Sequence, residues 1–68
     1  MRVIDIVKRI KDVKVYIEVK YNLENGGGSF GFYTKNEIHY NDKISQMKVD
    51  NINVQYIDNK RVIVLEVK

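Results

Sequence analysis

The sequence predicts an α+β domain in which a short N-terminal helix packs on an antiparallel meander of about five to six strands, a curved sheet or small barrel. Three observations favour this fold class. The apolar residues follow a helical period at the N-terminus and a period of two afterwards. Val and Ile dominate the apolar set. Asn and Asp recur in pairs at roughly eight-residue spacing. The 68 residues are expected to form one small domain.

Residues 2–12 are expected to form the helix. Apolar side chains recur there at the i, i+3, i+4 and i+7 spacing of one helix face. The residues on this face are Val3, Ile6, Val7, Ile10 and Val13. A strand is the alternative, although adjacent apolar pairs such as Val3-Ile4 interrupt the alternation that a half-buried strand requires. Because β-branched residues lose χ1 freedom in a helix, this helix must dock on the sheet to persist.

An alternating pattern over residues 13–23 is the strongest strand signal in the chain. Apolar side chains occupy every second position from Val13 to Leu23, so one face of this strand is expected to be core and the other wet. The run Asn25–Ser29 follows with three consecutive glycines, which favour a hairpin connection; a mobile ligand-contacting loop is the alternative. The run lacks the Gly-Lys-Ser/Thr ending of a phosphate-binding loop.

The rest of the chain, up to about residue 67, is interpreted as short antiparallel strands joined by two-residue turns. The turns are placed at Lys35-Asn36, Asn41-Asp42, Asp50-Asn51 and Asp58-Asn59. The strands are placed at Phe30–Thr34, Glu37–Tyr40, Ile44–Val49, Ile52–Ile57 and Arg61–Val67. The run 62–65 is apolar on both faces, which is typical of a central strand that is covered on both sides. Either the helix or a partner chain must provide the second cover.

Composition excludes several kinds of site and of protein. The chain has no cysteine and only one histidine, His39, so disulfides, thiolate metal sites and a structural zinc site are not expected, and neither is a cofactor. No apolar run approaches the length of a membrane span, and Asp5 and Lys8 interrupt the N-terminus, so neither a signal peptide nor membrane association is expected. We expect a cytoplasmic protein, of the organism or of an infected host.

Catalytic chemistry finds no support in the residue pattern. A Ser-His-Asp arrangement would have to combine His39 with a distant Ser29, and nothing in the spacing favours it. The carboxylates occur singly, mostly at turns, where turn formation already explains them. The run Asp50–Asn53 lacks the glycine and glutamate of a calcium loop. We therefore expect a binding protein and not an enzyme.

Aromatic residues beside lysines point to nucleic acid as the first candidate ligand. The chain is mildly basic, with a net charge of +3, and β-domains that bind single strands use exposed aromatics as stacking platforms flanked by cations. The residues predicted to bind are Lys14, Tyr16, Lys20, Tyr33, Lys35, His39 and Tyr40. Phe30 and Phe32 share one strand face in this interpretation and are expected to belong to the core.

The alternative is a protein-interaction module. A small chain without catalytic residues, with a last strand apolar on both faces, also suits a self-associating or inhibitory protein of viral or phage type. Such a module would use an exposed sheet edge or an apolar face, and its partner would be a second copy or another protein.

One stretch resembles a known family. The run Ser29–Tyr33 resembles the Gly-Phe-Gly-Phe core of the ribonucleoprotein motif in cold-shock domains, and Ile38-His39-Tyr40 is similar to that family's second motif. Lys20-Tyr21-Asn22 is similar to its Lys-Trp-Phe-Asn. The resemblance implies an oligonucleotide-binding barrel whose stacking residues are Tyr21, Phe30, Phe32 and His39. The lysine and first glycine of the motif are replaced by Gly28 and Ser29, and a helical segment precedes the first strand. We therefore assign the chain to no family on this basis.

Overall fold

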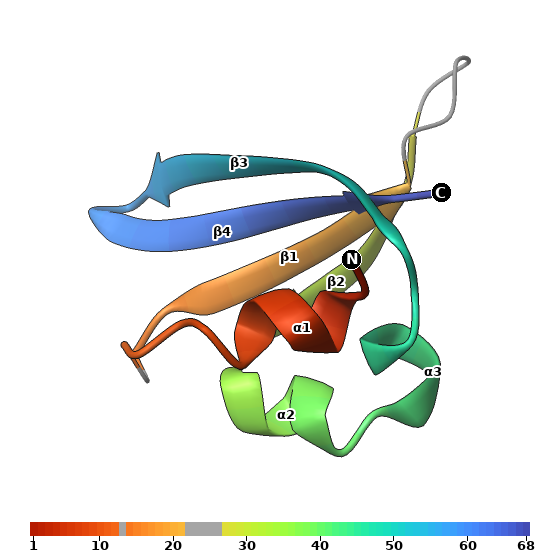
Figure 1. The fold of residues 1–68 in the computed structure, drawn as a ribbon. Helices are drawn as coiled ribbons and strands as arrows, with labels where there is room; N and C mark the ends of the chain where they lie inside the picture. Colours follow the sequence, from red (N-terminus) through yellow and green to blue (C-terminus); the bar gives the residue numbers. More distant parts are fainter. Residues whose placement is uncertain (13, 22–26) are drawn as a thin grey trace.

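The computed structural model describes residues 1–12, 14–21 and 27–68. Within them, one sheet lies over a layer of short helices (Figure 1). The elements in chain order are α1 (Val3–Val7), β1 (Tyr16–Tyr21), β2 (Ser29–Tyr33), α2 (Lys35–His39), α3 (Asp42–Ser45), β3 (Val49–Ile57) and β4 (Lys60–Val67). Val13 and part of the predicted glycine loop lie outside the described residues. None of the helices described is long and apolar enough to cross a membrane.

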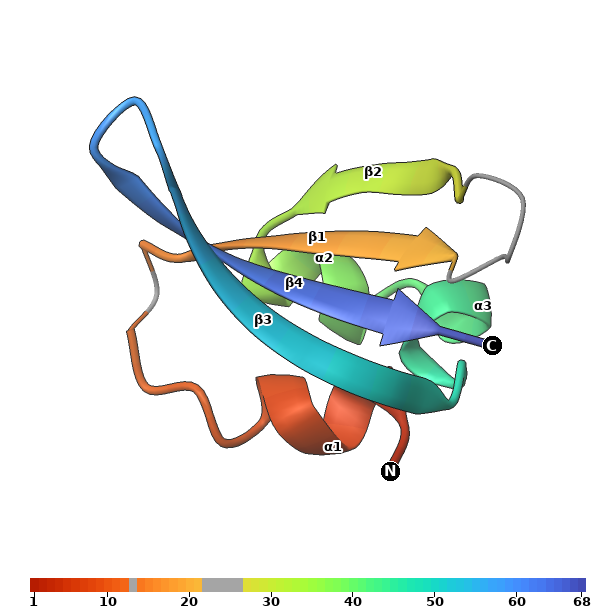
Figure 2. The ribbon, with the colours of Figure 1, turned by 90° about the horizontal axis from the view of Figure 1, so that it is seen from above.

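The sheet is mixed, so the predicted antiparallel meander of five to six strands is wrong. Its four described strands have the order β2-β1-β4-β3, with β2 and β3 at opposite edges (Figure 2). β1 pairs with β2 and β4 pairs with β3 in antiparallel fashion, while the central strands β1 and β4 are parallel. Parallel neighbours need a long crossover. Helices α2 and α3 lie within that crossover and carry the chain from one sheet edge to the other.

Two of the predicted strands fall largely or partly in helices, because nearby polar residues cap helix starts instead of forming turns. Glu37–Tyr40 falls in α2, where Thr34 Oγ1 accepts from the Glu37 amide at 3.3 Å and Glu37 Oε1 accepts from the Thr34 amide at 3.0 Å. This is a capping box. Asn41 Oδ1 likewise accepts from the Ile44 amide at 3.0 Å at the start of α3, which takes up the first two residues of the predicted strand Ile44–Val49.

Only one of the four predicted turns is a hairpin turn. Asp58 and Asn59 connect β3 to β4 with φ values of 51° and 63°, the left-handed pair that a type I′ turn requires. The pairs Lys35-Asn36 and Asn41-Asp42 lie at helix starts. Asp50 lies at a bulge inside β3, between the pairs that Val49 and Asn51 make with β4.

Helix α1 is shorter than predicted but of the predicted type. It spans Val3–Val7, and Asp5 Oδ2 accepts from the Arg2 amide at 3.0 Å at its start. Val3 and Val7 are buried against the sheet, which provides the docking that the β-branched sequence needs. The helix stops well before residue 12, where the chain leads into β1.

The core lies between the helices and one face of the sheet. Its fully buried side chains come from every helix and from the central strands: Val3, Val7, Ile38, Ile44, Ile17, Val19, Leu65 and Val67. β4 is a central strand, as the sequence indicated, but no described element covers its other face. Val62 and Val64 on that open face are only 3% and 1% exposed, since side chains of the flanking strands surround them.

The two phenylalanines of β2 lie on opposite faces, contrary to the prediction. Phe32 is paired with Glu18 and is 53% exposed on the open face, while Phe30 packs against the core. A register shift opposite Val19 and Lys20 separates them, and Gly31 has a φ of 131° there. Because few residues other than glycine adopt this φ, Gly31 permits the bulge.

The fold differs from the one that the cold-shock resemblance implies. That resemblance implies a barrel in which Ile38 and His39 lie on a strand, but both lie in helix α2. The described strands form one sheet with two separate edges.

Candidate functional site

The seven residues predicted to bind nucleic acid do not gather on one surface. Tyr16 and Lys20 lie on the open face of β1, and Lys14 precedes that strand. The other predicted residues lie in β2 or around α2: Tyr33, Lys35, His39 and Tyr40. Tyr16 and Lys20 therefore project from the face that the helices do not cover (Figure 1), whereas Lys14 lines a hollow together with Thr34, the residue before α2.

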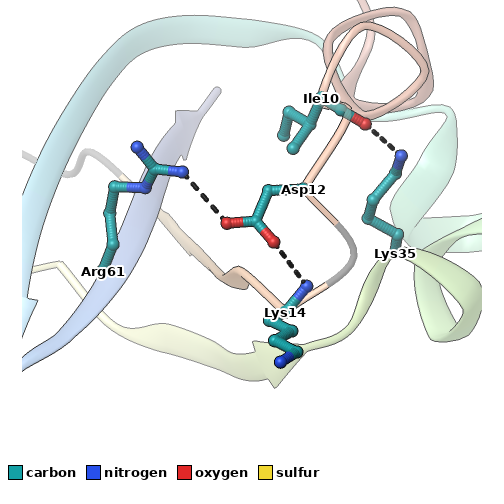
Figure 3. Close-up of polar contacts among 5 residues, drawn as sticks. All are labelled: Ile10, Asp12, Lys14, Lys35 and Arg61. Atoms are coloured by element: carbon teal, nitrogen blue, oxygen red, sulfur yellow. Dashed lines mark hydrogen bonds and ion pairs between the residues drawn. The ribbon is translucent and has the colours of Figure 1, made fainter.

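Two of the second group hold the fold together. Tyr33 is half-buried and its hydroxyl donates to the Phe30 carbonyl at 3.0 Å. The Lys35 ammonium donates to the Ile10 carbonyl and ties α2 to the segment after α1 (Figure 3). Both polar groups therefore have a role within the fold.

Asp12 joins the same segment to β1 and β4 (Figure 3). Its carboxylate accepts from the Lys14 amide at 2.9 Å and pairs with Arg61 Nη2 at 3.2 Å. Both side chains of the pair are about half exposed, so the ion pair adds little stability. Its main effect is to fix where the chain enters β1, beside the open face.

His39 and Tyr40 form an exposed aromatic pair at the end of α2. Their ring centroids are 5.2 Å apart in an edge-on arrangement, and Tyr40 is 84% exposed. Together with Lys8 and Lys35 they line a shallow groove between α1 and α2. Lys8 and Lys35 bring two positive charges to this groove.

A second aromatic surface, here called the aromatic corner, consists of Tyr16, Phe32 and Lys60 on the open face. The Lys60 ammonium lies 5.7 Å from the Tyr16 ring centroid, a cation–π arrangement. The three residues line a hollow together with Val62. Lys14 lines a second hollow, which shares Tyr16 and Lys60 with the first. Further along this face, Glu18 accepts from the Ser29 hydroxyl and Lys20 lies across from Glu66, so the charges balance.

A row of exposed apolar side chains lies on an edge strand. Ile52, Val54 and Tyr56 of β3 are 48%, 55% and 74% exposed. They pair with Leu65, Ile63 and Arg61, so all three side chains point to the helix-facing side. The tip of the β3–β4 hairpin extends past the helices (Figures 1 and 2), and Val54 and Tyr56, toward that tip, are more exposed than Ile52.

The hairpin turn determines which backbone groups of β3 are free. In a two-residue turn the flanking residues, Ile57 and Lys60, form a hydrogen-bonded pair. Hydrogen-bonded and non-hydrogen-bonded pairs then alternate along the antiparallel ladder. The N–H and C=O groups of Ile52, Val54 and Tyr56 therefore point away from β4, to the outer edge. We call residues 51–57 with these outward groups the β3 edge.

The β3 edge lacks the features with which proteins usually protect such strands. Edge strands are commonly blunted by charged residues, proline, bulges or a covering segment. Residues 51–57 contain no charge and no proline. The bulge at Asp50 and the bond from the Val49 amide to the Met1 carbonyl, at 2.8 Å, protect only the start of the strand.

A hollow adjoins the protected end of the β3 edge. It is lined by Met1, Ile6, Val49 and Ile52 together with the Asp50-Asn51 backbone step. Ile6 belongs to α1, so the hollow opens on the helix-facing side, the same side as the three exposed apolar residues of β3.

The sequence interpretation missed the β3 edge as a specific site. It placed a strand at Ile52–Ile57 but did not identify that strand as an edge. The available signal was the uncharged run 51–57, with apolar residues at every second position. It directly precedes Asp58-Asn59, which separates the predicted strands Ile52–Ile57 and Arg61–Val67.

Two specific features, a cluster of metal ligands and an unpaired buried polar side-chain atom, are absent from the described parts of the chain. No group of three or more His, Cys, Asp and Glu residues there is arranged to hold a metal ion. No buried side-chain polar atom among them lacks a hydrogen-bond partner.

Comparison of the chain with protein-family models, with curated proteins and with solved structures finds no match.

Proposed function

We propose that this chain is a binding protein that recruits an extended segment of another polypeptide to the β3 edge by β-strand addition. The observation that carries the proposal is the uncharged stretch 51–57, whose Ile52, Val54 and Tyr56 backbone groups point outward. In strand addition, main-chain hydrogen bonds supply affinity, and contacts to alternate side chains supply specificity.

The side chains of the β3 edge define what the added strand should look like. Its residues opposite Ile52, Val54 and Tyr56 would face the same side of the sheet as these apolar groups. One of them would lie beside the hollow of Met1, Ile6 and Val49. The preferred segment is thus an alternating one, apolar on one side and uncharged on the other, with a large apolar residue near its end.

Selection from a library of linear peptides tests this proposal. Peptides are selected on sparsely immobilised wild-type chain and then measured on Val54→Pro, which removes one outward N–H without touching the bonds to β4. We expect alternating apolar peptides to be enriched, and their affinity for Val54→Pro to fall at least about tenfold because a main-chain bond is lost.

The matched side-chain controls are two exposed tyrosines. Tyr56→Ala should weaken peptide binding, whereas Tyr40→Ala, at the far end of α2, should leave it unchanged. Circular dichroism melts confirm that each variant is folded. Equal peptide affinities for wild type, Val54→Pro and Tyr56→Ala would contradict the proposal.

Nucleic-acid binding at the aromatic corner is the second candidate function. The exposed Tyr16 and Phe32 rings, with Lys60 over Tyr16 and Lys14 nearby, support it because bases stack on such rings beside cations. Fluorescence anisotropy with short single-stranded DNA and RNA, over a series of salt concentrations, decides this point. Binding that weakens steeply with salt and with Tyr16→Ala would support it. No binding even at low salt would exclude it.

A further inference from the structure

We propose that the strand added at the β3 edge is β3 of a second copy of this chain, antiparallel to the first, with a two-fold axis at Val54. This inference rests on the proposed function, since it names the partner of the same surface. A two-fold axis makes the interface self-complementary, so every contact occurs twice. The two four-stranded sheets would become one continuous sheet across the molecules.

The sequence of the β3 edge is self-complementary about Val54. In this register Val54 lies opposite the second copy's Val54, and Ile52 lies opposite the second copy's Tyr56. These apolar pairs share the helix-facing side. Asn53 lies opposite the second copy's Gln55 on the other side, so amide meets amide. Directly opposed side chains are the pairs that interact most strongly in an antiparallel sheet.

The backbone selects the same register. The residues with outward N–H and C=O groups are Ile52, Val54 and Tyr56, which are spaced evenly about Val54. Centring on Val54 is the symmetric register in which all three meet one another. Centring on Gln55 would place Ile52 opposite the turn residue Asp58, and centring on Asn53 would place Tyr56 opposite the bulge at Asp50.

The hollow at the start of β3 provides a place for the most exposed apolar side chain of that strand. Tyr56 is 74% exposed and has no cover in its own chain. In the Val54-centred register the second copy's Tyr56 lies across from Ile52, which lines the hollow with Met1, Ile6 and Val49. Each copy supplies one tyrosine and one hollow, as a closed two-fold contact requires.

Charge and area both suit a second copy. Each chain carries a net charge of +3, so two copies repel over most approaches, but residues 51–57 bring no charge to the contact. A standard interface covers about a tenth of a small protein's surface. A tenth of 4977 Å² is about 500 Å². Ile52, Val54 and Tyr56, which are 48–74% exposed, offer the apolar part of such a contact together with Met1 and the hollow.

Oligomeric state tests the pairing directly. Sedimentation equilibrium over a wide concentration range should show a reversible dimer of the wild-type chain. Val54→Lys places two ammonium groups across the two-fold axis and should raise the dissociation constant at least about a hundredfold. Tyr56→Ala should raise it about thirtyfold. Tyr40→Ala, which removes an exposed tyrosine elsewhere, should leave it unchanged.

Cysteine cross-linking tests the register, and the native chain contains no cysteine to interfere. Opposed residues of a hydrogen-bonded antiparallel pair have Cα atoms about 5.5 Å apart, within the range that a disulfide spans. Val54→Cys should therefore form a disulfide-linked dimer rapidly under mild oxidation. Tyr40→Cys, at a more exposed but remote position, should not. Equal rates for the two variants would overturn the register.

A strictly monomeric wild-type chain at high concentration would overturn the second-copy proposal. That outcome leaves the proposed function open to its own test, because peptides selected on the monomer would still depend on Val54. Conversely, a dimer unaffected by Val54→Lys and Tyr56→Ala would show that copies associate elsewhere, which overturns pairing at the β3 edge.

Discussion

At the scale of single residues, Gly31 and the pair Asp58-Asn59 shape the two edges of the sheet. All three have positive φ, at 131°, 51° and 63°. Asp58 and Asn59 form the tight turn that fixes the register of β3 on β4, and hence which groups of β3 point outward. Gly31 permits the bulge that sends Phe30 to the core and Phe32 to the open face.

Gly31→Ala should destabilise the chain through its backbone alone. A Cβ at Gly31 would meet only ordinary contacts, the nearest being Tyr33 Oη at 3.7 Å, but the φ of 131° is strained for alanine. We expect a loss of about 1–3 kcal/mol in the free energy of unfolding, measured by urea denaturation.

Gly28→Ala is the matched control for this variant. There a Cβ would approach the Tyr21 ring to 3.0 Å, at a backbone conformation open to alanine. Because the tyrosine ring can move aside, this variant should lose less stability than Gly31→Ala. A larger loss of stability in Gly28→Ala than in Gly31→Ala would mean that side-chain crowding, and not backbone strain, determines the cost of alanine at these positions.

At the scale of elements, the short helices depend on their caps. Each of α2 and α3 buries one large apolar side chain, Ile38 and Ile44 respectively, so neither has a hydrophobic period of its own. The prediction of a strand at Glu37–Tyr40 is wrong for this reason: the run alternates like a strand, but the capping signature Thr34–Glu37 starts a helix there. By contrast, β1 and β4 bury several side chains each, and their patterns identified them.

Thr34→Ala should cost about 1 kcal/mol in the free energy of unfolding, because the hydroxyl satisfies the Glu37 amide at the start of α2. Thr34→Ser keeps the hydroxyl and should restore most of the loss. Urea denaturation of the three proteins measures both effects. A serine variant as unstable as the alanine variant would contradict a role for the cap.

At the scale of the whole molecule, the parallel pairing of β1 with β4 lay beyond sequence reasoning. The two strands are far apart in the chain, and nothing in their local patterns specifies which edge they share or in which direction. Because the strand pairing could not be predicted, the predicted nucleic-acid-binding residues were also placed together wrongly. Lys14 and Tyr16 do lie near one another, but Tyr33 and Lys35 proved to be internal contacts on the other side of the sheet. Identifying the β3 edge required the strand order.

Pairing of two copies should make thermal stability depend on concentration. Anything that binds only the folded chain stabilises it by mass action, and a second copy is such a ligand. The melting temperature of the wild-type chain should rise steadily as protein concentration increases. That of Val54→Lys should stay constant across the same series in differential scanning calorimetry. Parallel rises in both proteins would contradict stabilisation by this interface.

The two edges of the sheet differ in how open they are to another strand, and this difference limits how many copies can assemble. β3 is open, while β2 is short and interrupted at Gly31 by its extra residue, Phe30. A sheet that is open at both edges can add copies without limit and grow into a fibril. This sheet offers one edge, and an isologous pair uses it completely. Growth therefore ends at two chains. Deletion of Phe30 would remove the bulge from β2 and open the second edge of the sheet. We therefore expect this variant to form filaments.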